Sequence, residues 1–159
     1  MPQETPRHPL DNRIPPPVLA LVIAAVMVLV TRGAAPLAIP APARYTVSSA
    51  FVAVAGFMIL PAFAAFGRAG TTINPVRIDT ASSLVTMGVY RFTRNPMYLA
   101  LTCLLIALAV GLARGWAFAG PAIFALYITR FQIIPEERVM DAKFGDAYRD
   151  YRRRVRRWL

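Results

Sequence analysis

The sequence contains very little cysteine, histidine or acid. Its single cysteine, Cys103, excludes an intrachain disulfide and a zinc site built on cysteines. Its single histidine, His8, lies in a proline-rich leader, so a catalytic triad that depends on histidine is not expected. We therefore predict no metal site. Only 8 aspartates and glutamates face 18 lysines and arginines, which gives a net charge of +10.

The chain is also too apolar for an ordinary soluble domain. It is 57% hydrophobic, and its mean hydropathy is +0.48. Apolar runs with basic flanks are typical of a membrane protein whose cytoplasmic ends are basic. The arginines flank these runs and form no polar domain face, so we expect no nucleic-acid partner. The glycine-rich turn of a dinucleotide-binding fold is absent as well.

Charged residues divide the chain into four apolar runs, each close to the roughly 20 residues that a spanning helix needs. We predict an all-α integral membrane bundle of about four spans. Residues 1–17 are expected to form a disordered or surface-lying tail, and residues 18–159 a single membrane domain. The predicted spans lie near residues 18–31, 45–66, 96–113 and 116–134.

The basic residues predict the orientation of the spans. If both termini are cytoplasmic, the outer loops contain only Arg32, Arg44 and Arg114, and the other fifteen lysines and arginines lie inside. All eight acidic residues then lie inside too. The positive-inside rule favours this arrangement. We expect both termini and the chemistry to lie on the cytoplasmic side, and we expect a bacterial inner membrane as the location.

The C-terminal segment 135–158 has the pattern of an amphipathic helix pair. Apolar residues recur at spacings of three and four, and arginines occupy the opposite face. Gly145 is expected to end the first helix, since glycine adopts the backbone conformation that stops one. Such a pair should lie on the cytoplasmic membrane surface.

Asn95-Pro96 marks the start of the third span. Asparagine can cap free backbone N–H groups, and proline fits the first helical position. Arg91 and Arg94 precede this positive dipole end, so together they predict an anion site. The alternative is a capped membrane helix whose arginines only satisfy the positive-inside rule.

Glu136 and Glu137 follow the fourth predicted span directly. Adjacent carboxylates at the end of a membrane helix are costly unless they are solvated or paired. Pro135 has no N–H group and leaves the carbonyl of Phe131 without its usual donor. The alternative is an ordinary helix start, in which proline and glutamates suit the first turn.

Taken together, these motifs resemble a known superfamily, the isoprenylcysteine carboxyl methyltransferases and phospholipid methyltransferases. The resemblance covers about half of the chain, from Thr71 to Leu159. The motifs that carry it are Gly88-Val89-Tyr90-Arg91, Arg94-Asn95-Pro96-Met97-Tyr98, Glu136-Glu137 and Phe144-Gly145-x-x-Tyr148-x-x-Tyr151.

The resemblance implies a membrane enzyme that binds S-adenosylmethionine in a pocket closed by its C-terminal helices. The candidate catalytic residues are Glu136, Glu137 and Arg130. The partners that we expect are the lipid bilayer and a lipid-like or amphiphilic methyl acceptor. The residues implied in cofactor binding are Tyr90, Arg91, Arg94, Asn95, Pro96, Met97, Tyr98, Glu136, Glu137 and Tyr148.

Two departures from the superfamily bear on the acceptor. Isoprenylcysteine enzymes usually have histidine where this chain has Asn95, and arginine where it has Gln132. Arg130 lies two residues earlier, about 200° away around a helix, so it should not replace that arginine. We therefore expect an acceptor with an amine, thiol or hydroxyl head. Isoprenylcysteine-type O-methylation, a sterol reductase and a non-enzymatic lipid-binding protein remain the alternatives.

Overall fold

The computed structural model describes residues 8–69 and 84–159, and within these ranges it contains helices and no strands. The all-α prediction is therefore confirmed. The expected tail includes residues 1–7, and the resemblance begins at Thr71; both lie outside the described residues. The α-helices are α1 (Pro16–Val30), α2 (Ala41–Ala69), α3 (Pro96–Leu112), α4 (Ala119–Ile128) and α5 (Ile134–Arg154).

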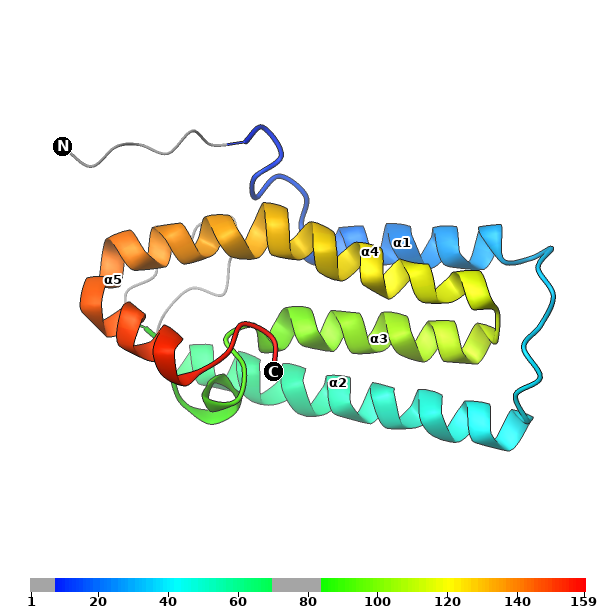
Figure 1. The fold of residues 1–159 in the computed structure, drawn as a ribbon. Coiled ribbons are helices and arrows are strands. Elements are labelled where there is room, and N and C mark those ends of the chain that lie inside the picture. The colour runs from blue at the N-terminus through cyan, green and yellow to red at the C-terminus, as the bar shows by residue number, and fades with distance from the viewer. Residues whose placement is uncertain (1–7, 70–83) are drawn as a thin grey trace.

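Helices α1 to α4 lie side by side, and α3 contacts the other three (Figure 1). Helix α5 continues from α4 beyond the bundle and then bends back, so the C-terminus lies near the start of α3 (Figure 1). The bend is at Gly145, whose φ of 52° is left-handed and suits glycine. The predicted helix break at Gly145 is thus confirmed.

Small residues let the helices approach one another closely toward the end of the bundle where α1 and α3 finish. Gly120 of α4 lies against α1, where a Cβ atom would come within 2.6 Å of Met27 Cγ. Ser48 of α2 donates a hydrogen bond to the Ala107 carbonyl of α3 at 3.0 Å. Close approach through small residues is the usual way in which helices associate in lipid.

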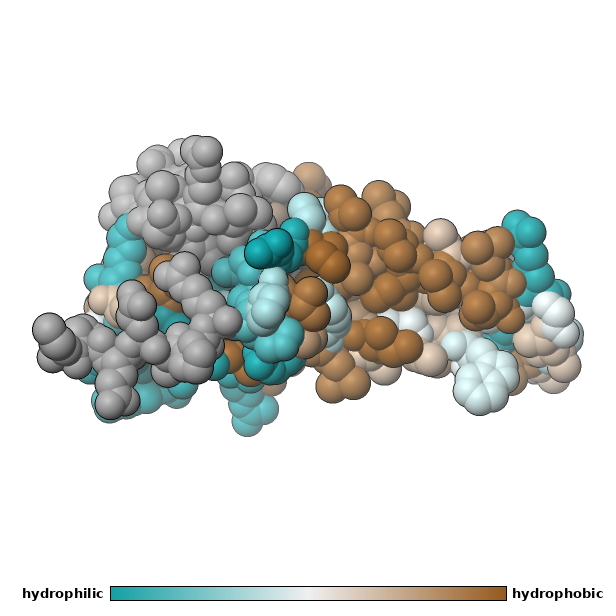
Figure 2. All heavy atoms as spheres, turned by 90° about the horizontal axis from the view of Figure 1, so that it is seen from above, coloured by the Kyte–Doolittle hydropathy of each residue, from teal (hydrophilic) through white to brown (hydrophobic). Residues whose placement is uncertain are grey.

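The outer surface of the bundle suits a membrane. Figure 2 shows apolar side chains along the face over α1 and α4, with hydrophilic ones toward its ends. Two helical stretches of the described residues, Ala41–Ala62 and Gly115–Arg154, are long and apolar enough to cross a bilayer. Helices α1 and α3 are apolar but shorter, with 15 and 17 residues. The number of four spans stays a prediction.

The turn between α3 and α4 is the tight hairpin that the sequence indicates. Ala113 ends α3 with a φ of 50°, and the short 3₁₀ helix η3 (Gly115–Phe118) leads into α4. The backbone N–H of Leu37 donates to the Ala113 carbonyl at 2.7 Å, which ties this turn to the α1–α2 loop. These two connections therefore form one end of the bundle, opposite the chain's C-terminus.

The last residues differ from the prediction. Helix α5 ends at Arg154, and Val155 takes an extended conformation with φ −124° and ψ 129°. Residues 155–159, called the C-terminal strap below, therefore leave the helix four residues before its predicted end at 158. The strap runs back toward the start of α3 (Figure 1).

Candidate functional site

Four segments meet at the end of the bundle that contains the C-terminus. They are the 3₁₀ helix η2 (Gly88–Arg91) with the loop after it, the start of α3, the junction of α4 with α5, and the C-terminal strap. At this junction the chain makes one π-helical turn, η4 (Thr129–Ile133), directly before α5. A π-helical turn inside a longer helix often occurs at a functional site.

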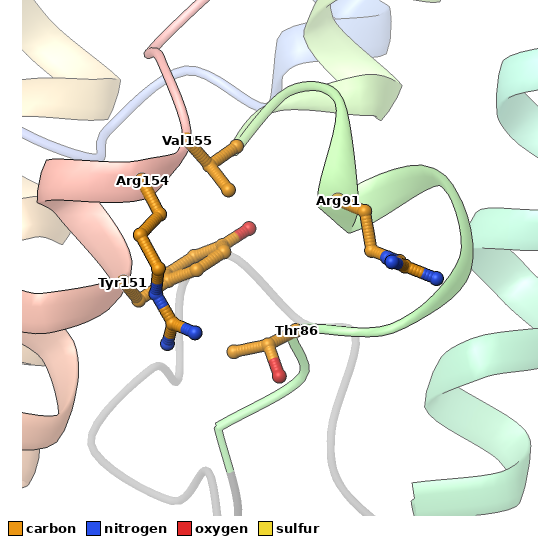
Figure 3. Close-up of a pocket in the computed structure, with 5 residues that line it drawn as sticks. All are labelled: Thr86, Arg91, Tyr151, Arg154 and Val155. Atoms are coloured by element: carbon orange, nitrogen blue, oxygen red, sulfur yellow. The ribbon is translucent and has the colours of Figure 1, made fainter.

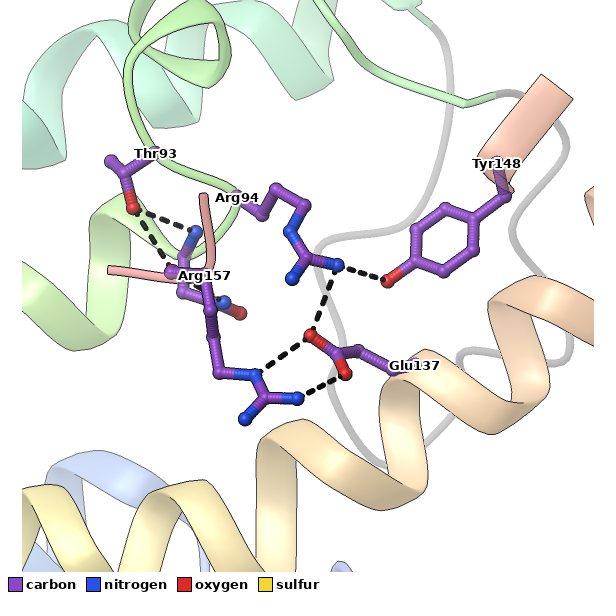
Figure 4. Close-up of polar contacts among 6 residues, drawn as sticks. Thr93, Arg94, Glu137, Tyr148 and Arg157 are labelled. Atoms are coloured by element: carbon purple, nitrogen blue, oxygen red, sulfur yellow. Dashed lines mark hydrogen bonds and ion pairs between the residues drawn. The ribbon is translucent and has the colours of Figure 1, made fainter. Parts of the chain in front are cut away.

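The centre of the site is a buried carboxylate, that of Glu137, held by two arginines (Figure 4). Arg94 Nη1 lies 3.0 Å from Glu137 Oε1. Arg157 binds the same carboxylate with two donors, Nε to Oε1 at 3.0 Å and Nη2 to Oε2 at 2.7 Å. The Arg94 and Glu137 side chains are each only 10% exposed. Glu137 therefore has the partners that a buried charge requires.

This cluster carries more positive than negative charge. Among the described residues, Glu137 is the only carboxylate that pairs with Arg94 or Arg157. Arg94 Nη1 also donates to the Tyr148 hydroxyl at 3.3 Å, but its buried Nε has no hydrogen-bond partner in the described part of the chain. A buried donor without an acceptor is costly. The cluster thus has both the charge and a free donor for an added anion.

Glu136 lies in a different environment from its neighbour. Its Oε1 accepts hydrogen bonds from the Tyr98 hydroxyl at 2.5 Å and from Gln132 Nε2 at 2.7 Å. Burial raises the pKa of Glu136 to about 7, although the two hydrogen bonds oppose the rise. Glu136 lies beyond the predicted span 116–134. A carboxyl group with a pKa near 7 can accept or donate a proton at neutral pH.

The C-terminal strap binds the start of α3 mainly through its backbone. The Arg94 N–H donates to the Arg156 carbonyl at 3.0 Å. The Arg157 carbonyl accepts hydrogen bonds from Thr93 Oγ1 at 3.2 Å and from Asn95 Nδ2 at 2.9 Å. At its end, Trp158 Nε1 donates to Thr129 Oγ1 at 3.3 Å. These contacts place Arg157 on Glu137.

The prediction that the Asn95 side chain caps α3 is wrong. Helix α3 does begin at Pro96 as expected, but no side-chain cap bond forms at Asn95. The Asn95 amide is instead used by the strap carbonyl, and the Asn95 N–H donates to Thr93 Oγ1 at 3.2 Å. The local sequence pattern predicts that the Asn95 side chain caps α3, but in the structure this side chain binds the strap instead.

Arg130 lies apart from the two glutamates. It is half exposed, its guanidinium is 3.7 Å from the carboxylate of Asp11, and it stacks on the ring of Phe131. The N–H of Asn12 donates to the Phe131 carbonyl at 2.9 Å, so the tail supplies the donor that Pro135 lacks. The structure thus gives Arg130 no contact with the candidate catalytic carboxylates.

The other candidate cofactor residues are distributed around the cluster. Pro96 is buried in the first turn of α3, and Met97 packs beside the buried side chain of Tyr90. The Tyr90 carbonyl accepts a hydrogen bond from the Tyr151 hydroxyl at 2.7 Å. Arg91 is exposed and lines a separate pocket. The structure therefore brings Arg94, Asn95, Tyr98, Tyr148 and the two glutamates together, but not Arg91 or Arg130.

Sequence reasoning missed the residues that the strap contributes. Arg157 is one of several arginines in the tail, and nothing in their spacing separates it from Arg156. Thr93 precedes the recognised motif, and its role depends on the strap carbonyl that it binds. Gln132 was noted only for what it replaces, yet its position four residues before Glu136 could have indicated the contact.

Comparisons with known proteins agree with the resemblance. Residues 43–147 match the model of the phospholipid methyltransferase family. A protein of Haemophilus influenzae, described as uncharacterized, is 48% identical over 63 residues, which are 40% of this chain and 100% of that protein. No solved structure matches. The family match includes Arg94 and both glutamates, and it ends before Tyr148 and the C-terminal strap.

Proposed function

Because the chain belongs to the phospholipid methyltransferase family, we propose that it is a membrane methyltransferase that takes its methyl group from S-adenosylmethionine. The observation that carries the proposal is the pairing of buried Glu137 with Arg94 and Arg157. The methionine part of this cofactor has one carboxylate and one ammonium group. A site with two guanidiniums and one carboxylate is complementary to both.

The residues present fit this cofactor. The buried Nε of Arg94 has no partner among the described residues and can donate to the methionine carboxylate. Glu137 can accept from the α-ammonium group, because a carboxylate has acceptor sites for several donors. Tyr98 and Tyr148 lie beside the two glutamates, since the Tyr98 hydroxyl donates to Glu136 and the Tyr148 hydroxyl accepts from Arg94. We assign the carboxylate of the cofactor to Arg94, with Arg157 as a second cation.

When bound, S-adenosylmethionine supplies an activated methyl group on a sulfonium, so the protein mainly has to provide alignment and a dry site. Arg94 and Glu137 provide alignment, since each is fixed by a partner from another segment. The C-terminal strap covers the start of α3 through the Arg156 and Arg157 carbonyls. Because the cofactor supplies the activated group and the protein only aligns it, a chain whose only histidine is His8 can carry out this reaction.

Glu136 is proposed as the proton acceptor for an amine substrate. An ammonium group has to lose a proton before its nitrogen can attack a methyl group. With a pKa of about 7, the Glu136 carboxyl group is half ionised at neutral pH and can take that proton. Tyr98 and Gln132 hold its Oε1, which leaves Oε2 to face the acceptor. A thiolate or carboxylate acceptor would not need this base.

The charge next to Glu136 argues against a carboxylate acceptor. Gln132 contacts Glu136, whereas Arg130 pairs with Asp11. Because Arg94 and Arg157 pair with Glu137 and are assigned here to the cofactor, a carboxylate acceptor beside Glu136 would have no cation of its own, and an unpaired buried carboxylate costs several kcal/mol. We therefore propose an acceptor with an amine, thiol or hydroxyl head on an apolar body, and poor activity on prenylcysteine carboxylates.

The proposed location is the cytoplasmic face of a bacterial inner membrane, with both termini in the cytoplasm. The start of α1, the end of α4 and the C-terminus all lie toward the same end of the bundle (Figure 1). The three arginines expected outside, at positions 32, 44 and 114, lie in the segments between α1 and α2 or between α3 and α4, or near the start of α2. This supports the orientation that the positive-inside rule favours.

Methyl transfer from labelled S-adenosylmethionine tests the function. Membranes with and without the protein would be incubated with the labelled cofactor, and their lipids and small thiols analysed by mass spectrometry. Phosphatidylethanolamine and a farnesylated cysteine derivative would be compared as added acceptors. We expect label in an amine, thiol or hydroxyl compound. Rapid labelling of the farnesylated carboxylate would support the isoprenylcysteine alternative, and no label in any compound would refute the proposal.

A further inference from the structure

A pocket lies beside the Arg94–Glu137–Arg157 cluster and shares none of these three residues. It has a volume of about 240 Å³ and is formed by the loop around η2 and the end of α5 (Figure 3). Tyr151 forms one wall, and its hydroxyl already donates to the Tyr90 carbonyl. The residues that line the pocket are Thr86, Arg91, Tyr151, Arg154 and Val155.

Two arginines line this pocket without a carboxylate partner. Arg91 comes from η2 and Arg154 from the last turn of α5; they lie on opposite sides of the pocket, and the exposed side chain of Arg91 is turned outward (Figure 3). Within the part of the chain that the structure describes, neither arginine forms an ion pair; the nearby Asp150 carboxylate pairs with Arg153 instead. Arg154 Nε donates only to a backbone carbonyl, that of Asp150. The pocket thus carries two positive charges and is suited to bind an anion.

Apolar side chains next to the pocket indicate where this anion comes from. Met87 and Phe92 flank the η2 helix, and they are 75% and 67% exposed. Large apolar side chains beside exposed cations are typical of segments that lie in a membrane interface. A free anion such as inorganic phosphate gains nothing from these side chains, whereas the acyl chains of a lipid cover them.

We infer that this pocket binds the phosphate of an anionic membrane phospholipid. The Arg154 guanidinium contacts the phosphate from one side, the Arg91 guanidinium contacts it from the other once this exposed side chain turns inward, and the Thr86 hydroxyl is a further donor. Met87 and Phe92 lie among the acyl chains. Basic pockets at the cytoplasmic side of a membrane protein bind anionic head groups in this way. The site holds η2 and the end of α5 to the membrane surface, and it does not depend on methyl transfer.

Binding of phosphatidylglycerol tests the inference, because this lipid is anionic and has no amine to methylate. The full chain would be placed in phosphatidylcholine nanodiscs that contain increasing amounts of phosphatidylglycerol, and retained lipid measured by native mass spectrometry. Arg91→Gln and Arg154→Gln should each lower the apparent affinity about fivefold, as one arginine near an anionic surface contributes about that factor. Arg91→Lys should keep most of it.

Arg153→Gln is the matched control, since Arg153 is exposed on the same helical turn but does not line the pocket. If this variant lowers the affinity as much as Arg154→Gln, general surface charge explains the binding and the inference is wrong. Displacement of phosphatidylglycerol by inorganic phosphate would show a free-anion site, and displacement by S-adenosylmethionine would show a cofactor site. Either result overturns the lipid assignment. Because no cofactor is added in the main assay, failure there leaves the proposed function untouched.

Discussion

The two ends of the bundle are held together by different forces. Toward the end where α1 finishes and α4 begins, Gly120 lies against Met27, and the neighbouring contacts are apolar. At the C-terminal end, three charged side chains and a run of hydrogen bonds join the strap to α3 and α5; the charged ones are Arg94, Glu137 and Arg157.

The difference between the two regions indicates that one serves the stability of the fold and the other the binding of a ligand. Close apolar packing is sensitive to volume and insensitive to pH, so changes where α1 packs on α4 should affect folding. Buried ion pairs add little net stability, because desolvation offsets most of their attraction. The charges at the C-terminal end are therefore better explained by a ligand that they recognise than by the fold that they join. Substitutions in the two regions should produce different kinds of defect.

The largest expected effect is on folding, from a methyl group near the start of α4. In Gly120→Ala the new Cβ atom would lie 2.6 Å from Met27 Cγ, so the buried Met27 side chain has to move or α1 and α4 have to separate. We expect a loss of about 2 kcal/mol in stability. Gly56→Ala is the control, because nothing lies within 4 Å of a Cβ atom there. Thermal aggregation in detergent measures both, and equal behaviour of the two variants would refute this account of the packing.

The next largest effect is on the pH dependence of the methylation rate, through Glu136. The Glu136 carboxyl group is neutral below a pKa of about 7 and ionised above it, so its action as a base increases with pH. With an amine acceptor, the ionised fraction and the rate should rise about tenfold from pH 6 to pH 8. Glu136→Gln should lose this rise while Tyr98 keeps a hydrogen-bond partner. An unchanged pH profile in the variant would assign the titration to another group.

The smallest expected effect comes from the strap. Arg157→Gln removes two hydrogen bonds to Glu137, and Arg157 is one-third exposed, so we expect about fivefold weaker cofactor binding. Arg156→Gln is the matched control, because Arg156 contacts Arg94 through its backbone carbonyl, which the substitution keeps. If both variants bind equally well, the strap positions no ligand and serves only the fold.

The sequence predicts the helical bundle well because a lipid bilayer restricts the structures that a chain can form in it. Charge-free runs and proline positions located the helices, and α3 starts at Pro96 as expected. Gly145 and the Ala113 turn are local backbone events that glycine and polar residues signal. The position of the strap could not be predicted from the sequence. Its contacts are made by backbone carbonyls, and they depend on a turn at Val155 that no periodic pattern encodes.

The sequence predicts only part of the candidate site. Arg94 and the glutamates stand out because charges next to membrane helices are costly. Their partners come from sequence-distant segments, and the choice of Arg157 over its neighbours depends on the extended backbone after Arg154. Arg130 was misleading because its guanidinium faces the N-terminal tail, where Asp11 is its partner.

Titration of the purified protein with S-adenosylmethionine tests the central claim most directly. The wild-type chain should show saturable binding in isothermal calorimetry, and Glu137→Gln should bind at least about tenfold more weakly, since a hydrogen bond to a charged group is worth ~1.5–3 kcal/mol. Asp150→Asn, which changes an exposed carboxylate paired with Arg153, should bind like the wild type. Size-exclusion profiles would verify that each variant is folded. Binding by Glu137→Gln that equals or exceeds the wild type would contradict the assignment of this cluster to the cofactor.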